Sequence, residues 1–447
     1  MAIQKLFGTS GIRGEAQKLF TNQFCFDIGR SFAKLLDLHK QFGPVAIGLD
    51  PRPSSLRIFK SVSQGLIFAG REVISQGYCP IPAVNYILKT THYAGSIMVT
   101  GSHIDISLNG FKFFIFKEEI LKDNEKELER IYAKTKEKII FKKRETLIKK
   151  EKKAKKAYAE MLINLSEKPY PRWRVVVDPG NGAQSEFMSK ILFRLGLEVI
   201  AINDSLKRGF ISRDTEIEGA FLPLQERVLK EKADFGIGYD ADGDRVIFVD
   251  QKGKFVPGDY TGALIAKYSD TPVVVTPINT SQVVEYLGKP VIRTMIGSLS
   301  VIEGMKLNKA TFGFEANGGG ISSEIMMSRD GGSTTIKILN LLKKSKKSFS
   351  QIIQTLPYFC LYRMKVNCPI KFYEIIYQTV KKKFKGIRIE ELGCLKIWVD
   401  NSSWILFRGS GNAPEFRVFA EAKEERRAKK LAEEGMSLVK KVIKKGL

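Results

Sequence analysis

This 447-residue chain has few of the residues that build disulfide scaffolds, zinc sites or membrane spans. Its five cysteines, an odd number, lie far apart without a CxxC pair, and only three residues are histidine. This usage argues against a disulfide framework and against a zinc site. The longest apolar runs are under ten residues, well short of the ~20 that a membrane-spanning helix needs. We therefore expect scattered core thiols and no transmembrane segment.

A secretory leader is not expected either. The first residues, MAIQKLFG, lack the charged head and the apolar stretch of roughly 7 to 15 residues that a signal peptide carries. We therefore predict a cytoplasmic location. The hydrophobic fraction of 43% and the charged fraction of 27% are ordinary for a globular protein. At roughly 100 to 200 residues per domain, the length predicts two to four domains.

Positive charge is abundant, with a formal net charge of +25. Residues 134–156 hold twelve Lys or Arg and three Glu, and apolar residues recur among them at roughly helical spacing. This pattern predicts one or two amphipathic segments with a very basic outer face. Such a face is either solvated, or it binds nucleic acid or an anionic surface. Binding to nucleic acid or to an anionic surface would be accompanied by a recognition motif, or by exposed aromatic residues interleaved with the basic ones. The stretch shows neither feature, which favours a solvated face. A compositional drift without any function would explain the basic residues as well.

Short β-branched runs alternate with helix-like segments along the chain, which is typical of parallel α/β layers. Residues 45–50 and 272–277 are candidate buried strands, and residues 174–183 are expected to run strand, turn, helix. From about residue 364 the pattern becomes β-rich, with helices to one side. We therefore predict an α/β protein with three similar α/β domains built on mixed sheets and a smaller α+β domain at the carboxyl end. The predicted domain boundaries are 1–155, 156–252, 253–364 and 365–447.

An acidic turn, DADGDR at residues 240–245, follows one predicted strand. Alternating carboxylates on a tight loop can direct three oxygens at one hard cation, and Gly243 lets the backbone curl around it. The preceding GxGxxA pattern resembles a dinucleotide fingerprint, but three carboxylates at the pyrophosphate position would repel that ligand. An EF-hand loop requires Gly and Glu where this chain has Arg245 and Gln251. The better match is Mg²⁺ bound by few carboxylates and a phosphate oxygen.

A second motif, TGSH at residues 100–103, is followed by NGFK at residues 109–112. A serine after glycine at the end of a strand is accessible, and His103 with Lys112 could handle its proton or the charge of a phosphate that it carries. Taken alone, the pattern is weak, because catalytic partners need spatial rather than sequential adjacency.

Two further motifs suit a phosphorylated sugar. RGSGNAPEFR at residues 408–417 combines glycines, a hydroxyl, an amide and two arginines, which suits a phosphate cradle. EANGGG at residues 315–320 presents a carboxylate and an amide, a pairing suited to sugar hydroxyls.

These four motifs, together with FGTSGIRG at residues 7–14, resemble the α-D-phosphohexomutase superfamily of phosphomannomutases, phosphoglucomutases and phosphoglucosamine mutases. TGSH, EANGG and SGNAPEFR look most like a subset of bacterial phosphomannomutase-type members. The resemblance implies four domains around a central cleft, with one or two motifs in each domain. It also implies an activating phosphate on Ser102.

The resemblance assigns a role to each motif residue. The implied Mg²⁺ ligands are the phosphorylated Ser102, Asp240, Asp242 and Asp244. The implied catalytic residues around the transferring phosphate are Ser102, His103, Arg13, Lys112 and Arg245. The implied substrate-binding residues are Glu315 and Asn317 at sugar hydroxyls, and Arg408, Ser410, Gly411, Asn412 and Arg417 at the phosphate that does not react.

The implied activity is the interconversion of hexose 6-phosphate and hexose 1-phosphate through a bisphosphate intermediate, with hexose 1,6-bisphosphate as activator. The subset favours mannose phosphate, with glucose and glucosamine phosphates as alternatives. TGSHID replaces the usual TASHNP, GNAP replaces GTEP, and Ser298 stands where many members have His or Asp. An alternative hypothesis from another functional class is a catalytically inactive protein that binds phosphosugars or nucleic acid. We expect no membrane or nucleic-acid partner, and a monomer or homodimer.

Overall fold

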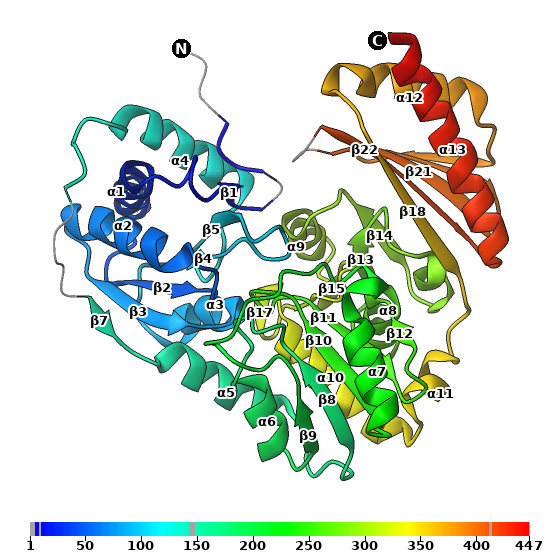
Figure 1. Ribbon diagram of the computed structural model, residues 1–447, viewed down its shortest axis with the longest axis horizontal. Coiled ribbons are helices and arrows are strands. Elements are labelled where there is room, and N and C mark those ends of the chain that lie inside the picture. The colour runs from blue at the N-terminus through cyan, green and yellow to red at the C-terminus, as the bar shows by residue number, and fades with distance from the viewer. Residues whose placement is uncertain (1–4, 9, 143–147, 411–413, 447) are drawn as a thin grey trace.

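The computed structural model describes residues 5–8, 10–142, 148–410 and 414–446. Within these residues the strands form four sheets, which follow one another along the chain (Figure 1). The first three sheets mix parallel and antiparallel strands and carry helices on both faces, whereas the fourth is antiparallel. This arrangement confirms the predicted fold class of three α/β domains and a smaller carboxyl-terminal α+β domain.

The first sheet has the strand order β1-β5-β4-β2-β3-β7, and β6 pairs with β5. Its strands are β1 (Ile12–Glu15), β2 (Val45–Leu49), β3 (Val73–Tyr78), β4 (Gly95–Val99), β5 (Leu108–Ile115), β6 (Glu118–Glu119) and β7 (Lys149–Lys150). The flanking helices are α1 (Asn22–Leu38), α2 (Ser55–Phe68), α3 (Ile81–Thr90), α4 (Lys122–Thr135) and α5 (Lys153–Leu165). Val45 and Ile47 share a buried cluster with residues of α1 and α2, whereas Ala46 packs with residues of α3. This alternation follows from the two-residue period of a strand.

The second sheet has the order β12-β11-β10-β8-β9. Its strands are β8 (Arg174–Asp178), β9 (Glu198–Ala201), β10 (Phe235–Tyr239), β11 (Val246–Asp250) and β12 (Phe255–Val256), with helices α6 (Met188–Arg194) and α7 (Leu222–Lys230). The helix expected directly after β8 begins only at Met188. Gly180, Asn181 and Glu186 have positive φ, so this connection makes turns before the helix can start.

The third sheet has the order β14-β13-β15-β16-β17. Its strands are β13 (Val274–Pro277), β14 (Val291–Thr294), β15 (Phe312–Phe314), β16 (Gly320–Ser322) and β17 (Met326–Arg329). Its helices are α8 (Gly258–Tyr268), α9 (Ser298–Leu307), α10 (Gly331–Ser345) and α11 (Phe349–Ile353). One large buried cluster includes residues of α3, α5, α6, α8 and α10, so the first three domains share a continuous core.

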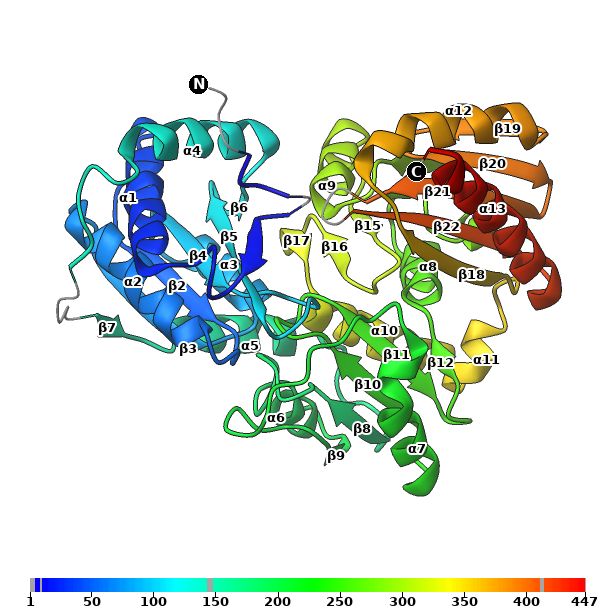
Figure 2. The same ribbon diagram turned by 45° about the horizontal axis from the view of Figure 1, so that its top comes forward.

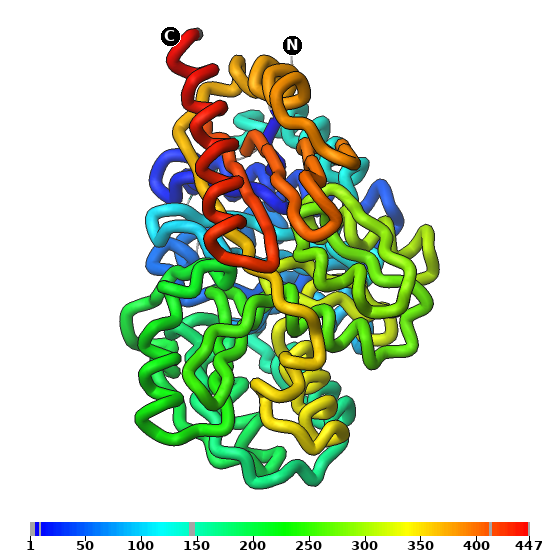
Figure 3. The backbone as a smooth tube through the Cα atoms, turned by 90° about the vertical axis from the view of Figure 1, so that its right-hand side faces the viewer, coloured from blue at the N-terminus to red at the C-terminus, as the bar shows by residue number. Residues whose placement is uncertain are grey.

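The fourth sheet has the order β18-β22-β21-β20-β19, and α13 crosses one face of it (Figure 3). The elements are β18 (Cys360–Asn367), α12 (Tyr373–Lys383), β19 (Arg388–Glu391), β20 (Leu395–Asp400), β21 (Ser403–Gly409), β22 (Glu415–Ala422) and α13 (Glu425–Gly446). On the other face, Trp404 and Phe419 pack with Ile278 of the third domain. The Lys396 side chain donates to the Ile278 carbonyl at 3.0 Å, and the backbone amide of Gln282 donates to the Glu421 carboxylate at 2.9 Å. These contacts seat the fourth domain on the third.

The sheets divide a few residues away from the predicted domain boundaries. β12 at residues 255–256 still pairs with β11 of the second sheet, and β18 of the fourth sheet begins at Cys360. The predicted boundaries themselves stay a prediction, because strand pairing alone does not fix where a domain ends.

The basic stretch at residues 134–156 differs from the predicted amphipathic helices. Only its ends are helical, as the end of α4 and the start of α5, and residues 143–147 lie outside the described part of the chain. The Gln23 side chain donates to the Ile139 carbonyl at 2.9 Å and accepts from the Phe141 amide at 2.6 Å. The Phe141 ring contacts Phe26 at a centroid distance of 5.7 Å. Side chains of α1 thus hold residues 139–141 in a non-helical conformation.

Three of the motifs begin where a strand ends, and the loops that carry them meet where the first three domains come together (Figure 2). TGSH follows β4, DADGDR follows β10, and EANGGG follows β15. Loops at the carboxyl ends of parallel strands are the usual place for binding sites in α/β folds. Among the described residues, no helix has the length and apolar character needed to cross a membrane.

Candidate active site

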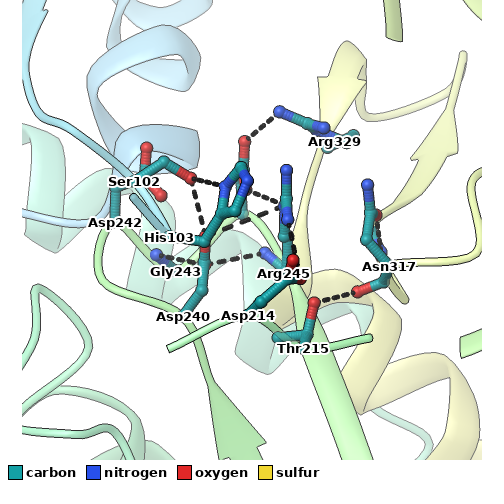
Figure 4. A network of polar contacts seen from close by, with 12 residues as sticks. Ser102, His103, Asp214, Thr215, Asp240, Asp242, Gly243, Arg245, Asn317 and Arg329 are labelled. Carbon is teal, nitrogen blue, oxygen red and sulfur yellow. Dashed lines mark hydrogen bonds and ion pairs between the residues drawn. The ribbon is translucent and has the colours of Figure 1, made fainter. Parts of the chain in front are cut away.

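Ser102 of the first domain contacts the acidic turn of the second (Figure 4). Its Oγ donates to Asp240 Oδ2 at 2.9 Å, and His103 Nδ1 lies 3.4 Å from the same Oγ. Ser102 has φ +52°, an unusual conformation for a residue with a side chain, and such strain is often found at functional sites. Ser102, the predicted nucleophile, and the adjacent His103 therefore lie at the predicted metal site.

An arginine that the sequence analysis missed holds this loop in place. Arg52 is buried, and its guanidinium donates to the carbonyls of four loop residues and to the side chain of Asp50. The carbonyls belong to Ser102, Ile104, Asp105 and Leu108. Gly101 lies so close to this guanidinium that an added Cβ would be 2.6 Å from Arg52 Cζ. Arg52 thus fixes the backbone that carries Ser102.

We expect Arg52→Met to destabilise the first domain. The change leaves the buried Asp50 without its cation and removes one donor from each of the four carbonyls, and breaking one side of a buried ion pair costs about 3 to 5 kcal/mol. Thermal unfolding followed by calorimetry should show a melting temperature several degrees lower. The double variant Asp50→Asn/Arg52→Met should recover part of the loss, and an unchanged melting temperature in Arg52→Met would contradict the assignment.

The acidic turn has the donor set of a divalent cation site. Asp240, Asp242 and Asp244 are buried, and one carboxylate oxygen from each lies within 4.8 Å of the others. Asp240 Oδ1 accepts from the amides of Gly243 at 3.1 Å and Arg245 at 3.2 Å, which curls the loop around this carboxylate. Asp242 Oδ1 and Asp244 Oδ1 are buried without a hydrogen-bond partner among the described residues. Buried carboxylate oxygens require a partner, and Mg²⁺ binds such hard oxygen ligands.

Positive side chains surround the turn. Lys112 Nζ donates to Asp242 Oδ2 at 3.1 Å and to Asp244 Oδ2 at 3.0 Å. Burial alone would lower the pKa of Lys112, but the two carboxylates outweigh it and raise that pKa above its ordinary value. Burial would likewise raise the pKa of Asp244, but Arg329 and Lys112 lower it below its usual range. Burial, together with Asp242 and Asp244, raises the pKa of Asp240 well above its ordinary value.

Arg13, Arg245 and His103 lie close enough to interact electrostatically. Burial and the charge of Arg245 lower the pKa of Arg13 to about 10. Burial, Arg245 and Arg13 also lower the pKa of His103 well below its ordinary value, so the imidazole is neutral at pH 7. Arg13 Nε and Arg245 Nε are buried without a hydrogen-bond partner within the described ranges. Guanidinium N–H groups that make no hydrogen bond within the protein suit an anion such as a phosphate.

The sugar-loop residues lie beside the acidic turn. Glu315 Oε2 accepts from Arg329 at 2.8 Å and from Asn317 Nδ2 at 3.4 Å. The Asn317 carbonyl accepts from Thr215 Oγ1 at 2.9 Å. Both predicted residues are buried, and Arg329 links Glu315 to Asp244 of the acidic turn.

Residues 214–216 connect three parts of the site and were also missed from the sequence. Asp214 pairs with Arg245 at 3.4 Å, and Thr215 bonds the sugar loop. Glu216 pairs with Arg363 of the fourth domain at 3.3 Å. This short segment therefore touches the acidic turn, the sugar loop and the fourth domain.

The phosphate-cradle residues lie on the fourth domain. Arg408 of β21 and Arg417 of β22 are directly opposed in the antiparallel ladder, and Ser410 follows β21. Burial and Arg417 lower the pKa of Arg408, whereas the charges of Glu216 and Glu315 act in the opposite direction. Like charges directly opposite one another are destabilising, and an anion between them would relieve this. Gly411 and Asn412 lie outside the described residues.

The missed residues did carry a sequence signal. Arg52 follows β2 within DPRPSS, and Arg329 closes β17 within SRDGG. Both stretches place an arginine within two residues of an aspartate at the end of a strand, the position where three of the motifs begin. No comparable signal marks residues 214–216, which lie well beyond the end of β9 at Ala201.

Comparison with known proteins agrees with this geometry. The α/β/α domains I, II and III of the phosphoglucomutase/phosphomannomutase family match residues 4–139, 156–253 and 257–359. A phosphoglucomutase/phosphomannomutase of Thermococcus kodakarensis is 31% identical, with 98% of this chain and 99% of that protein covered. A phosphoglucosamine/phosphogalactosamine mutase of Sulfurisphaera tokodaii is 28% identical, with 98% and 99% covered.

A crystal structure of a phosphoglucomutase/phosphomannomutase family protein from Burkholderia thailandensis shares the fold. Its TM-score is 0.82 at 20% identity, with 99% of this chain and 98% of that chain covered. The domain matches cover most of the chain in the order that the sheets have. With the Thermococcus relative, they show that the chain belongs to the phosphoglucomutase/phosphomannomutase family of the α-D-phosphohexomutase superfamily.

Proposed function

We propose that this phosphohexomutase interconverts hexose 6-phosphate and hexose 1-phosphate through a phosphate carried on Ser102. The observation that carries the proposal is the 2.9 Å contact between Ser102 Oγ and Asp240 Oδ2. It joins a hydroxyl of the first domain to the acidic turn of the second, inside a group of buried cations. A hydroxyl at a cation site with guanidinium and ammonium donors is suited to phosphoryl transfer.

The proposed reaction has two transfers. In the first, the Oγ–P bond of phosphorylated Ser102 breaks as the free hydroxyl of a hexose monophosphate bonds to phosphorus. The proton that the attacking hydroxyl loses must reach the Ser102 Oγ that leaves phosphorus, and the neutral His103 can pass it to this oxygen, because its Nδ1 lies 3.4 Å from Oγ. The hexose bisphosphate then reorients, and its other phosphate returns to Ser102 while the sugar oxygen regains a proton. Arg13, Arg245 and Lys112 stabilise the charge on the transferring group.

Asp240, Asp242 and Asp244 would hold Mg²⁺ together with an oxygen of the Ser102 phosphate. The free oxygens of Asp242 and Asp244 fit this cation. When bound, Mg²⁺ would offset charge on the transferring phosphoryl group. A crystal structure of Aspergillus fumigatus N-acetylphosphoglucosamine mutase, which shares the fold, contains a hexosamine phosphate and magnesium. Hexose 1,6-bisphosphate is the proposed activator, because it can phosphorylate Ser102.

Mannose phosphate is the proposed substrate, on the sequence pattern of TGSH, EANGG and SGNAPEFR. The names of the relatives also include phosphoglucomutase and phosphoglucosamine mutase, so glucose and glucosamine phosphates are the alternatives. Turnover of the three hexose 1-phosphates, measured side by side with Mg²⁺ and a trace of the matching bisphosphate, decides between them. We expect kcat/KM to be highest for mannose 1-phosphate, and a higher value for another sugar would overturn this choice. The cytoplasmic location and the monomeric or homodimeric state stay predictions.

We expect Arg417→Ala to lower kcat/KM about ten- to a hundred-fold. Arg417 faces Arg408, and its Nε is buried without a partner among the residues that the structure describes. Loss of a charge-assisted hydrogen bond to phosphate costs roughly 1.5 to 3 kcal/mol. The same contact is needed after the bisphosphate reorients, so kcat should also fall, and released bisphosphate should become detectable in a coupled assay.

The basic stretch provides the matched control. Replacing Lys149, Lys150, Lys152 and Lys153 by Gln removes four exposed charges in and next to β7, which lies at the edge of the first sheet, three strands away from β4. Exposed charges more than ~8 Å from the substrate are largely screened at physiological salt, so KM should change little. A large loss from the lysine variant with little from Arg417→Ala would overturn the cleft assignment. It would also favour the alternative in which the basic stretch binds nucleic acid or an anionic surface.

A further inference from the structure

Arg329 connects two of the motif loops. It is the last residue of β17 and is buried. Its Nη1 donates to Glu315 Oε2 and its Nη2 to Asp244 Oδ2, each at 2.8 Å. Asp244 belongs to the acidic turn after β10, and Glu315 to the sugar loop after β15. One planar guanidinium therefore bonds a carboxylate from each of two domains.

On the side of the acidic turn, this contact decides which oxygen of Asp244 is free. Oδ2 accepts from Arg329 at 2.8 Å and from Lys112 at 3.0 Å. Oδ1 is buried without a hydrogen-bond partner in the described part of the chain, with Arg245 Nε 3.9 Å away. Rotating the carboxylate would break two charge-assisted hydrogen bonds, so Oδ1 is held available for a cation. Groups that orient a metal ligand in this way tune the affinity of the site.

On the side of the sugar loop, the contact holds Glu315. This carboxylate is 6% exposed, and a buried charge requires a charged partner to be tolerated. Its Oε2 is occupied by Arg329 and, at 3.4 Å, by Asn317 Nδ2. A carboxylate fixed through one oxygen presents the other in a set direction, which suits an acceptor for a sugar hydroxyl.

We propose that Arg329 is a positioning residue that orients Asp244 for the cation and Glu315 for the sugar, so that one side chain sets the geometry of both binding events. The inference rests on the proposed function, since it takes the acidic turn as the cation site and Glu315 as a sugar ligand. It assigns Arg329 no contact with the reacting atoms.

Two binding measurements on the full chain test the inference without turnover. The first titrates Mn²⁺, a paramagnetic substitute for Mg²⁺, in the absence of sugar and follows it by electron paramagnetic resonance. The second titrates mannose 1-phosphate without metal or bisphosphate by calorimetry. In Arg329→Gln, we expect the Kd for Mn²⁺ to rise about ten- to a hundred-fold, the usual effect of losing a group that orients a metal ligand. The Kd for mannose 1-phosphate should rise about tenfold, the size of one hydrogen bond to a charged group.

Arg293→Gln is the matched control. Arg293 lies in the same domain and pairs with Glu285 at 2.9 Å and with nearby carbonyls, none of which belongs to a motif loop. Both Kd values should stay within about twofold of the parent in this variant. Equal changes in Arg293→Gln and Arg329→Gln would show a general loss of structure in this domain and would overturn the positioning role.

Arg329→Lys separates charge from geometry and decides the question by itself if Arg329→Gln does not fold. A single ammonium lacks the planar fork that bonds both carboxylates at once. At least one of the two Kd values should therefore rise about tenfold, and both at the parent level would overturn the two-point bridge. A parent protein that binds neither Mn²⁺ nor mannose 1-phosphate would overturn the proposed function, and the inference with it. A parent that binds both, beside an Arg329→Gln variant with unchanged affinities, would overturn the inference alone.

Discussion

Ser102→Ala should lower kcat by at least ~10³, because the variant has no hydroxyl to carry the phosphate between the two transfers. Sugar phosphate should still bind, since the residues proposed to hold it lie on the third and fourth domains. Steady-state kinetics with hexose 1-phosphate gives kcat, and intact-protein mass spectrometry after incubation with bisphosphate gives the extent of phosphorylation. The parent should gain one phosphate, and Ser102→Ala should gain none.

Ser107→Ala is a suitable control for this experiment. Ser107 lies in the same loop, is exposed, and bonds Asp105 rather than the acidic turn. Its substitution should leave kcat and phosphorylation near the parent values. Near-normal turnover by Ser102→Ala, or a phosphate found on another residue, would remove Ser102 from its proposed role.

Removal of the divalent cation is expected to abolish activity altogether. The three carboxylates of the acidic turn are buried close together, and without a cation their mutual repulsion is only partly offset by Lys112 and Arg329. Excess chelator should therefore stop turnover in the parent, and added Mg²⁺ should restore it. Zn²⁺ should substitute poorly, because the proposed ligands are all oxygen atoms.

The Asp242→Asn variant tests the same metal site by changing one of its proposed ligands. The substitution keeps the size of the side chain but removes an anionic ligand whose Oδ1 has no partner among the described residues. The Mg²⁺ concentration for half-maximal activity should rise, and Mn²⁺ titration should show the same loss of affinity. Asp234→Asn, which removes an exposed carboxylate of the same domain bonded to the Arg174 amide, should change neither. Full activity of the parent in excess chelator would disprove the metal site.

Local features of the sequence were sufficient to predict the fold class and most of the site. Every residue of β2 and β4 is buried, and a short, mostly apolar run of this kind is typical of a buried strand in a parallel sheet, so such strands can be predicted without coordinates. Three acidic residues within five positions share one turn because they are so close along the chain. The resemblance to the superfamily then gave the motifs their order, and the domain matches confirm the family.

The basic stretch shows where local reasoning failed. Its apolar spacing predicted helices, but residues 139–141 bond the side chain of Gln23 on α1 instead. Helical periodicity describes which side chains share a face, and it does not say whether a neighbouring helix will offer the backbone other partners. That choice depends on packing between segments more than a hundred residues apart in the chain, with sequence separations of 116 and 118.

The sequence by itself determined which chemical groups this protein can use: one serine after a glycine, three alternating carboxylates, and arginines within a glycine-rich turn. Tertiary structure alone decided which groups meet. The Ser102–Asp240 contact joins residues 138 positions apart, and the Arg329–Asp244 contact joins residues 85 positions apart. Hydrogen bonds and ion pairs depend on distances of a few ångströms between atoms, and sequence separation does not set such distances. The orientation of Asp244 and Glu315 by Arg329 therefore emerged only when the sheets were placed together.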